Sequence, residues 1–202
     1  MYTVNPGIED IAAEEVLAEI GGRVDYSLLT GHVFHEVDVL NPESILRLRS
    51  VNKAFILLYS GVIGSKISDL VKFKNDLLKN IQSMNIDEYI TPYTTFAVET
   101  ERIGGHEFTS IDVSRLVGDV IIESIHSKHG FKPRVDLRKP NVIIHVFIRD
   151  DKVYLGVSLT SSMSLHRRGY RIYDHPAALK PTLAYAMLTI SGTRDKDVIV
   201  DP

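Results

Sequence analysis

The polar loop at residues 101–110 is the first place where residue types and spacing suggest chemistry. It reads Glu-Arg-Ile-Gly-Gly-His-Glu-Phe-Thr-Ser and lies between a strand-like run and a helical pattern. Loop amides and a helix N-terminus can hold a phosphate, and arginine can donate two parallel hydrogen bonds to one. The candidate phosphate contacts are Arg102, His106 and Ser110, beside Thr109. A helix cap in a solvated loop is the alternative, and the residue types leave both open.

Two basic clusters could extend such a surface. The first follows the helical pattern and comprises Lys128, Lys132, Arg134, Arg138 and Lys139. The second comprises Arg167, Arg168, Tyr170 and Arg171. Arginine binds phosphate, and histidine or tyrosine can stack on an unpaired base, so the combination favours single-stranded RNA. No recognition helix for duplex DNA is evident, and each cluster taken alone could also be a solvated face.

The distribution of charge favours a polyanionic partner for the later part of the chain. Residues 1–43 contain nine acids and one base, a net charge of −8. Because the whole chain carries −3, the remaining 159 residues carry +5. We therefore expect RNA to contact the later residues.

Other chemistries have little support. The chain has no cysteine, which excludes disulfides and cysteine-based zinc sites, and its eight histidines contain no His-Glu-x-x-His pattern. Neither a glycine-rich phosphate loop nor a Gly-x-Ser-x-Gly elbow is present, so we predict no catalytic residue, metal or cofactor in this chain. No apolar run approaches ~18 residues and no secretory signal is present, so we expect a cytoplasmic protein without a membrane span.

The first third of the chain predicts a β-α-β-β-α-β order, which is the ferredoxin-like unit. A short strand precedes Pro6-Gly7, and a helix with acids on its outer face follows over residues 8–20. Strands are predicted at 24–30 and 33–40, with Gly31-His32 as their turn. A short helix should begin with Asn41 as its cap and Pro42 at its first position. A buried strand over 54–63 completes the unit.

A second α/β unit is predicted after it. The pattern favours a helix within 65–84, a strand over 94–100, and a helix over 111–129 that Gly130 ends. Residues 142–147 and 153–159 read as a hairpin. A helical pattern then begins near Pro176.

Several of these runs resemble a known family. Residues 96–113 and 135–142 resemble the central part of a THUMP domain. The junction Leu165-His166-Arg167-Arg168-Gly169-Tyr170-Arg171, with residues 175–184, resembles that of THUMP-containing RNA methyltransferases that modify the exocyclic amine of guanine. Residues 4–10 resemble the opening of their N-terminal domain.

The resemblance implies an α+β fold: a ferredoxin-like domain over 1–62, a THUMP domain over 63–163, and a linker with the start of a truncated Rossmann-like methyltransferase domain over 164–202. It implies that the THUMP domain holds tRNA at its 3′ acceptor end. It also implies S-adenosylmethionine as the cofactor of the full-length parent, with residues 197–202 as the first strand before the cofactor loop.

The chain departs from the family pattern after that strand. The glycine-rich loop and the later Asn/Asp-Pro-Pro-aromatic motif are missing. We therefore expect a truncated chain that is inactive by itself. A stand-alone THUMP adaptor that presents tRNA, or a fragment of a ribosomal RNA methyltransferase, is the alternative. We expect Arg168, Tyr170 and Arg171 to be partly structural, and the main RNA surface to combine the 102–110 loop with the 128–139 cluster.

Overall fold

The computed structural model describes residues 1–39, 41–160, 164–165, 167, 173, 175, 177–194 and 196–200. Its contacts divide the chain into two compact units. Unit 1 comprises residues 1–54 and 163–202, and unit 2 comprises residues 55–162. The fold is mixed α/β, with strands hydrogen-bonded in the order β2-β3-β1-β4-β8-β7-β5-β6.

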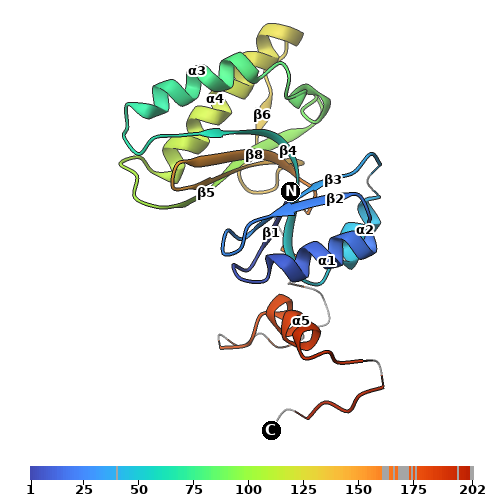
Figure 1. The fold of residues 1–202 in the computed structure, drawn as a ribbon. Helices are drawn as coiled ribbons and strands as arrows, with labels where there is room; N and C mark the ends of the chain where they lie inside the picture. Colours follow the sequence, from blue (N-terminus) through green and yellow to red (C-terminus); the bar gives the residue numbers. More distant parts are fainter. Residues whose placement is uncertain are drawn as a thin grey trace. The chain divides into compact units, whose positions relative to one another are not determined.

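Unit 1 is built on an antiparallel ladder with a helix packed against it (Figure 1). Its elements are β1 (Tyr2–Val4), α1 (Glu9–Glu19), β2 (Arg23–Tyr26), β3 (His32–Glu36), α2 (Pro42–Arg47), the start of β4 (Val51–Val62), and α5 (Pro181–Ile190). This is the predicted β-α-β-β-α-β order, followed by one later helix. The helix α1 contacts β2 and β3, and Ala12 and Val16 on its inner face are fully buried.

The expectation that the acids of α1 lie on its outer face is wrong for two of them. Glu9 is fully buried, and its carboxylate accepts hydrogen bonds from the backbone N–H groups of Gly31 at 2.7 Å and Gly7 at 2.9 Å. Burial raises the pKa of Glu9, but these N–H donors outweigh it and the pKa is lowered. Glu15 likewise accepts from the N–H groups of Arg49 at 2.7 Å and Ser50 at 2.9 Å. Both acids therefore satisfy loop backbone groups that would otherwise be buried without partners.

In unit 1, the start of α2 is predicted correctly, whereas the ends of β2 and β3 are not. Asn41 caps α2 as expected, because its side chain accepts from the N–H of Glu43 at 3.0 Å, and Pro42 is the first helical residue. The predicted strands 24–30 and 33–40 are too long. A five-residue loop separates β2 from β3, with Leu29 and Gly31 in the left-handed region at φ 65° and 74°.

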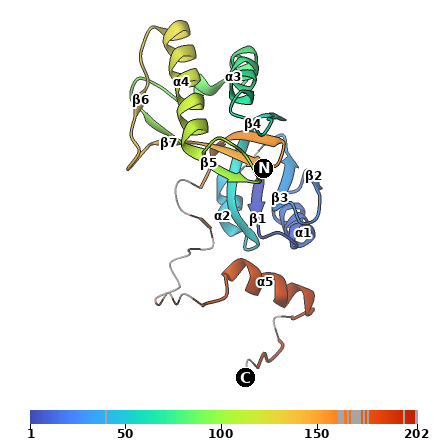
Figure 2. The same cartoon turned by 90° about the vertical axis from the view of Figure 1, so that its left-hand side faces the viewer.

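In unit 2, α3 (Asp69–Asn80) and α4 (Ser110–His129) cover one face of the sheet (Figure 2). The strands are the rest of β4 with β5 (Thr95–Ile103), β6 (Arg134–Val135), β7 (Val142–Arg149) and β8 (Lys152–Ser158). The pairs β5·β6 and β5·β7 are parallel, and β4·β8 and β7·β8 are antiparallel. A 3₁₀ turn, η1 (Ile86–Glu88), precedes β5.

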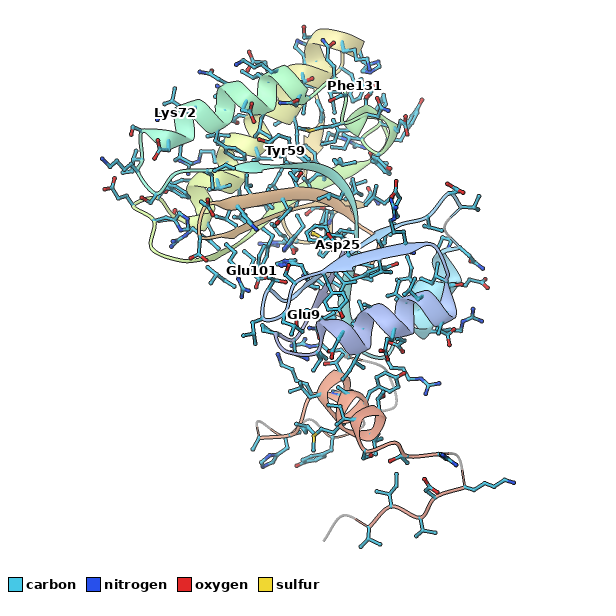
Figure 3. The ribbon with its side chains drawn as sticks, viewed as in Figure 1. Glu9, Asp25, Tyr59, Lys72, Glu101 and Phe131 are labelled. Atoms are coloured by element: carbon cyan, nitrogen blue, oxygen red, sulfur yellow. The ribbon has the colours of Figure 1, made fainter. Side chains whose placement is uncertain are left out.

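The core of unit 2 follows from the alternation of its strands. Ile144, Val146 and Ile148 point to the helices from β7, and they pack with the buried stripes of α3 and α4. Tyr59 of β4 also points toward α3, where its hydroxyl donates to the carboxylate of Asp76 (Figure 3). Burial, followed by this hydrogen bond, raises the pKa of Tyr59. A polar contact therefore ties the sheet to α3.

The helix α4 matches its prediction closely. The apolar repeat predicts a buried stripe of Val113, Leu116, Val117, Val120, Ile121 and Ile125. All of these are buried except Leu116, which is partly buried against the same core. Thr109 is its N-cap, and Gly130 ends it in the left-handed region at φ 76°. A strong apolar repeat between a cap residue and a glycine predicts a helix from local sequence alone.

The strand β4 belongs to both units. Tyr2 and Thr3 of β1 pair with Ala54 and Lys53, whereas residues from Phe55 onward pair with β8. Along the chain, the boundary between the two units therefore falls between Ala54 and Phe55, within the continuous strand β4 rather than at a linker.

The C-terminal residues return to unit 1. The helix α5 begins at Pro181 rather than near Pro176, and its buried Thr182 accepts a hydrogen bond from the Asn5 side chain at 2.7 Å. The guanidinium of Arg49 lies 5.7 Å from the centre of the Tyr185 ring. The described residues 197–200 are exposed and form no strand, contrary to the expectation for 197–202. A strand requires a neighbour for its backbone groups, and none pairs with these residues in the described part of the chain.

Candidate nucleic-acid interface

The loop after β5 brings two of the predicted phosphate contacts together. The Nη1 of Arg102 donates to the carbonyl oxygen of Gly104 and lies 3.1 Å from the Nδ1 of His106. The Nε2 of His106 lies 2.7 Å from the carbonyl oxygen of Asp150, in the β7–β8 turn. Since a carbonyl only accepts, Nε2 carries the proton and Nδ1 accepts from Arg102. Both side chains are therefore already engaged in fixing the loop.

Gly104 is required for this arrangement. It has φ of 116°, which side-chain-bearing residues rarely adopt, and a Cβ there would lie 3.0 Å from Asp150 Oδ1. The loop and the β7–β8 turn are thus packed backbone against backbone.

The N-terminus of α4 carries a capping box. The Oγ1 of Thr109 accepts from the N–H of Asp112 at 3.2 Å, and the Asp112 carboxylate accepts from the N–H of Thr109 at 2.8 Å. A further hydrogen bond from the Thr109 hydroxyl is the main reason why the pKa of Asp112 is lowered. The capping box thus occupies two amides where a phosphate could bind, one through the Asp112 carboxylate and one through the Thr109 hydroxyl. Ser110 is the first helical residue. RNA contacts of Arg102, His106 and Ser110 stay a prediction.

Lys128 lies at the opposite end of α4 and has an acidic partner. Its Nζ is 2.7 Å from the carboxylate of Asp87, which also lies 2.8 Å from the Nε2 of His129. The hydrogen bond from Lys128 is the largest influence that lowers the pKa of Asp87 to about 2. Much of the positive charge of Lys128 is therefore compensated within the protein.

The remaining members of the first cluster are more available. The side chains of Lys132, Arg138 and Lys139 are exposed and have no carboxylate partner among the described residues. Among the described residues, Arg134 donates only to the carbonyl oxygen of Pro92, at 3.4 Å. Lys132 borders a shallow cavity of about 310 Å³ that is also lined by Asp119, Ile122, Glu123 and His126. That cavity is mixed in charge, so the cationic character is concentrated at 134–139.

The 102–110 loop and the 134–139 segment lie at opposite ends of β5. Thr95 pairs with Arg134, whereas Arg102 pairs with Ile148 next to the β7–β8 turn. At ~3.3 Å per residue, the nine residues of β5 separate these ends by about 26 Å. The two sets of side chains expected to form the main RNA surface are therefore separated along β5, and their RNA contacts stay a prediction.

Of the second basic cluster, the structure describes one residue, Arg167. Arg167 is exposed, and its backbone N–H donates to the carbonyl oxygen of Ser164 at 2.9 Å. Arg168, Tyr170 and Arg171 lie outside the described residues.

Two exposed apolar side chains at the basic segment are not among the residues that the sequence predicts to contact RNA. Tyr93 is 88% exposed and Leu137 is 80% exposed. An aromatic residue directly after the turn-forming pair Thr91-Pro92 was the available signal in the sequence.

Metal binding and membrane insertion have no structural counterpart among the residues described. No group of three or more His, Asp or Glu side chains is placed to hold a metal ion. None of the helices in the described ranges is long and apolar enough to cross a bilayer.

Two protein families match parts of the chain. The THUMP domain family matches residues 71–158, from α3 to the end of β8. The family described as the RMKL-like methyltransferase domain matches residues 168–202. The chain therefore contains a segment similar to the THUMP domain family, followed by one similar to that methyltransferase family.

Known proteins are similar to nearly the whole length of the chain. A tRNA (guanine(6)-N2)-methyltransferase of Methanocaldococcus jannaschii is 30% identical over 99% of the chain and 51% of its own length. One of Archaeoglobus fulgidus is 31% identical over 99% of the chain and 49% of its own length. The crystal structure of TrmN from Thermus thermophilus is 26% identical with a TM-score of 0.66, covering 95% of the chain and 53% of that protein. The chain thus spans about half the length of these relatives.

Proposed function

We propose that this chain is the RNA-binding part of a tRNA guanine-N2 methyltransferase and that it docks the acceptor end of tRNA. The observation that carries the proposal is the identity of 30% and 31%, across 99% of the chain, with two proteins named tRNA (guanine(6)-N2)-methyltransferase. Those proteins are about twice as long, so the proposal includes a catalytic domain outside these residues.

The domain assignment belongs to the proposal. We assign residues 1–62 to a ferredoxin-like domain, 63–163 to the THUMP domain, and 164–202 to a linker and the start of a Rossmann-like methyltransferase domain. The β-α-β-β-α-β order and the antiparallel strand order β2-β3-β1-β4 support the first assignment. The two family matches support the second and third.

S-adenosylmethionine is the proposed cofactor of the full-length protein, in which it would supply the methyl group. The residues present here do not fit it. Val198 and Val200 are 90% and 79% exposed rather than part of a strand that could support a cofactor loop. We therefore expect the 202-residue chain to bind RNA but neither to hold the cofactor nor to methylate.

A tRNA titration tests the RNA-binding role. Fluorescence anisotropy would compare intact tRNA with tRNA lacking its 3′ tail, at 50 and 200 mM salt. We expect sub-micromolar to micromolar binding of intact tRNA and weaker binding of the truncated form. With three or four phosphate contacts to a single strand, the affinity should fall roughly 20- to 50-fold between the two salt concentrations. Equal affinity for both forms would contradict acceptor-end docking.

A ribosomal RNA arm and the downstream reading frame separate the alternatives. Tighter binding of ribosomal RNA fragments than of tRNA would favour a ribosomal RNA methyltransferase. A stop codon directly after Pro202 would favour a stand-alone tRNA-binding adaptor. A continuing frame with a glycine-rich loop and an Asn/Asp-Pro-Pro-aromatic motif would support the proposed enzyme.

A further inference from the structure

The edge of the unit 2 sheet carries apolar and cationic side chains side by side. The strand β6 is its outermost strand. We define the β6 edge patch as Tyr93, Arg134, Val135, Leu137, Arg138 and Lys139. Tyr93, Leu137 and Val135 are 88%, 80% and 51% exposed. Single exposed apolar residues are ordinary, but three of them among three cations indicate a binding surface.

The backbone that carries Tyr93 is held in place. The Oγ1 of Thr94 accepts from the N–H of Thr91 at 2.8 Å, and the N–H of Thr94 donates to the carbonyl oxygen of Thr91 at 3.2 Å. The N–H of Tyr93 donates to the Oγ1 of Thr91 at 3.3 Å. The ring is therefore presented to solvent from a fixed turn, which reduces the entropy lost when a flat ligand stacks on it.

The cationic segment is fixed beside the same turn. The Nη2 of Arg134 donates to the carbonyl oxygen of Pro92, the residue before Tyr93. The end of the segment is pinned because the N–H of Asn141 donates to the carbonyl oxygen of Thr95 at 3.0 Å and the N–H of Thr95 donates to the Asn141 side chain at 2.9 Å. These bonds join the Tyr93 turn to the start of the segment at Arg134, and they hold its end at Asn141 against Thr95.

The charge of the patch favours a polyanion. Arg134, Arg138 and Lys139 have no carboxylate partner in the described part of the chain, as shown above. Asp136 lies between them, but its Oδ1 accepts from the N–H groups of Arg138 at 2.9 Å and Lys139 at 3.1 Å, and these donors lower its pKa. An acidic peptide would satisfy the cations but would leave the tyrosine face without a planar partner. Single-stranded RNA offers both phosphates and unpaired bases, and a duplex hides its base faces.

We propose that the β6 edge patch holds single-stranded RNA, with one unpaired base stacked on the Tyr93 ring and the flanking phosphates on Arg134, Arg138 and Lys139. This proposal rests on the proposed RNA-binding function and assigns that function to the β6 end of the sheet.

The test is a binding titration of the 202-residue chain with a fluorescein-labelled, eight-nucleotide single-stranded RNA. Stacking contributes ~1–3 kcal/mol per base, so Tyr93→Ala should weaken binding roughly 5- to 150-fold, and Tyr93→Phe should retain affinity. The salt dependence should stay unchanged in Tyr93→Ala. Tyr26→Ala, which removes a tyrosine that is 40% exposed on β2, is the matched control and should bind normally.

A series of RNAs with single abasic sites tests whether one base stacks on Tyr93. If every base is replaced in turn by an abasic site, one replacement should abolish the difference between the parent chain and Tyr93→Ala. Unchanged affinity of Tyr93→Ala, while the parent chain binds RNA, would overturn this proposal and leave the proposed function intact. No RNA binding by the parent chain would overturn both. Binding of a poly-glutamate peptide in place of RNA would also overturn the stacking assignment.

Discussion

Replacing Asp87 by Asn should lower the free energy of unfolding by about 1 kcal/mol at pH 7. The further decrease of this free energy at acidic pH should be smaller in the variant than in the parent chain. Asp87 links η1 to the end of α4 through Lys128 and His129, at 2.7 and 2.8 Å. A pKa held at about 2 instead of 3.8 corresponds to about 2.5 kcal/mol at ~1.4 kcal/mol per pKa unit. Because Lys128 and His129 are 50% and 38% exposed, solvent screening reduces that figure to about 1 kcal/mol.

The sign of the pH effect follows from the direction of the pKa difference. Asp87 is more acidic in the folded chain than in the unfolded one, so its stabilising contribution is complete above about pH 3.8. The contribution is lost as the pH falls from about 3.8 towards 2. The Asn variant lacks it throughout, so the two proteins should differ at pH 7 and converge near pH 2.

Urea denaturation followed by circular dichroism between pH 2 and 7 would measure this difference, and hydrogen exchange of the last turn of α4 would localise it. Glu88→Gln changes an exposed neighbouring acid and serves as the control. A free energy of unfolding for Asp87→Asn within about 0.3 kcal/mol of the parent at pH 7, with the same acid limb, would refute the reasoning. The variant also frees Lys128, so RNA affinity should be equal or higher if Lys128 contacts phosphate.

Two further stability predictions concern side chains that accept hydrogen bonds from backbone N–H groups. Thr109→Ala removes the N-cap of α4 and should cost about 1 kcal/mol in thermal or urea denaturation, whereas Thr109→Ser should cost little; equal losses in both would contradict the capping role. Glu15→Gln removes the charge that accepts from the N–H groups of Arg49 and Ser50, and should cost about 2 kcal/mol. The exposed neighbour Glu14→Gln is its control, and similar small effects of both would show that the buried carboxylate is not required.

The elements that the sequence predicted best are those with strong local signals. The apolar period of α4, its Thr109 cap and its Gly130 terminator all lie within about 20 residues, so the chain needs no distant partner to reveal them. The Asn41-Pro42 start of α2 is equally local. Strand ends were predicted less well, because a strand ends where its neighbour ends, as the β2–β3 loop shows.

The sequence by itself determined the residue types available for binding RNA, the order of helices and strands in the first unit, and the resemblance that the family matches confirm. Only the tertiary structure decided which of those residues are free. Arg102 is bonded to His106, Lys128 to Asp87, and Glu9 and Glu15 to loop amides. The physical reason is that these partners lie from 4 to 41 positions away, and pairing at the longer distances is set by strand register and helix packing. The same packing brings the turn that holds Tyr93 beside Arg134 of β6.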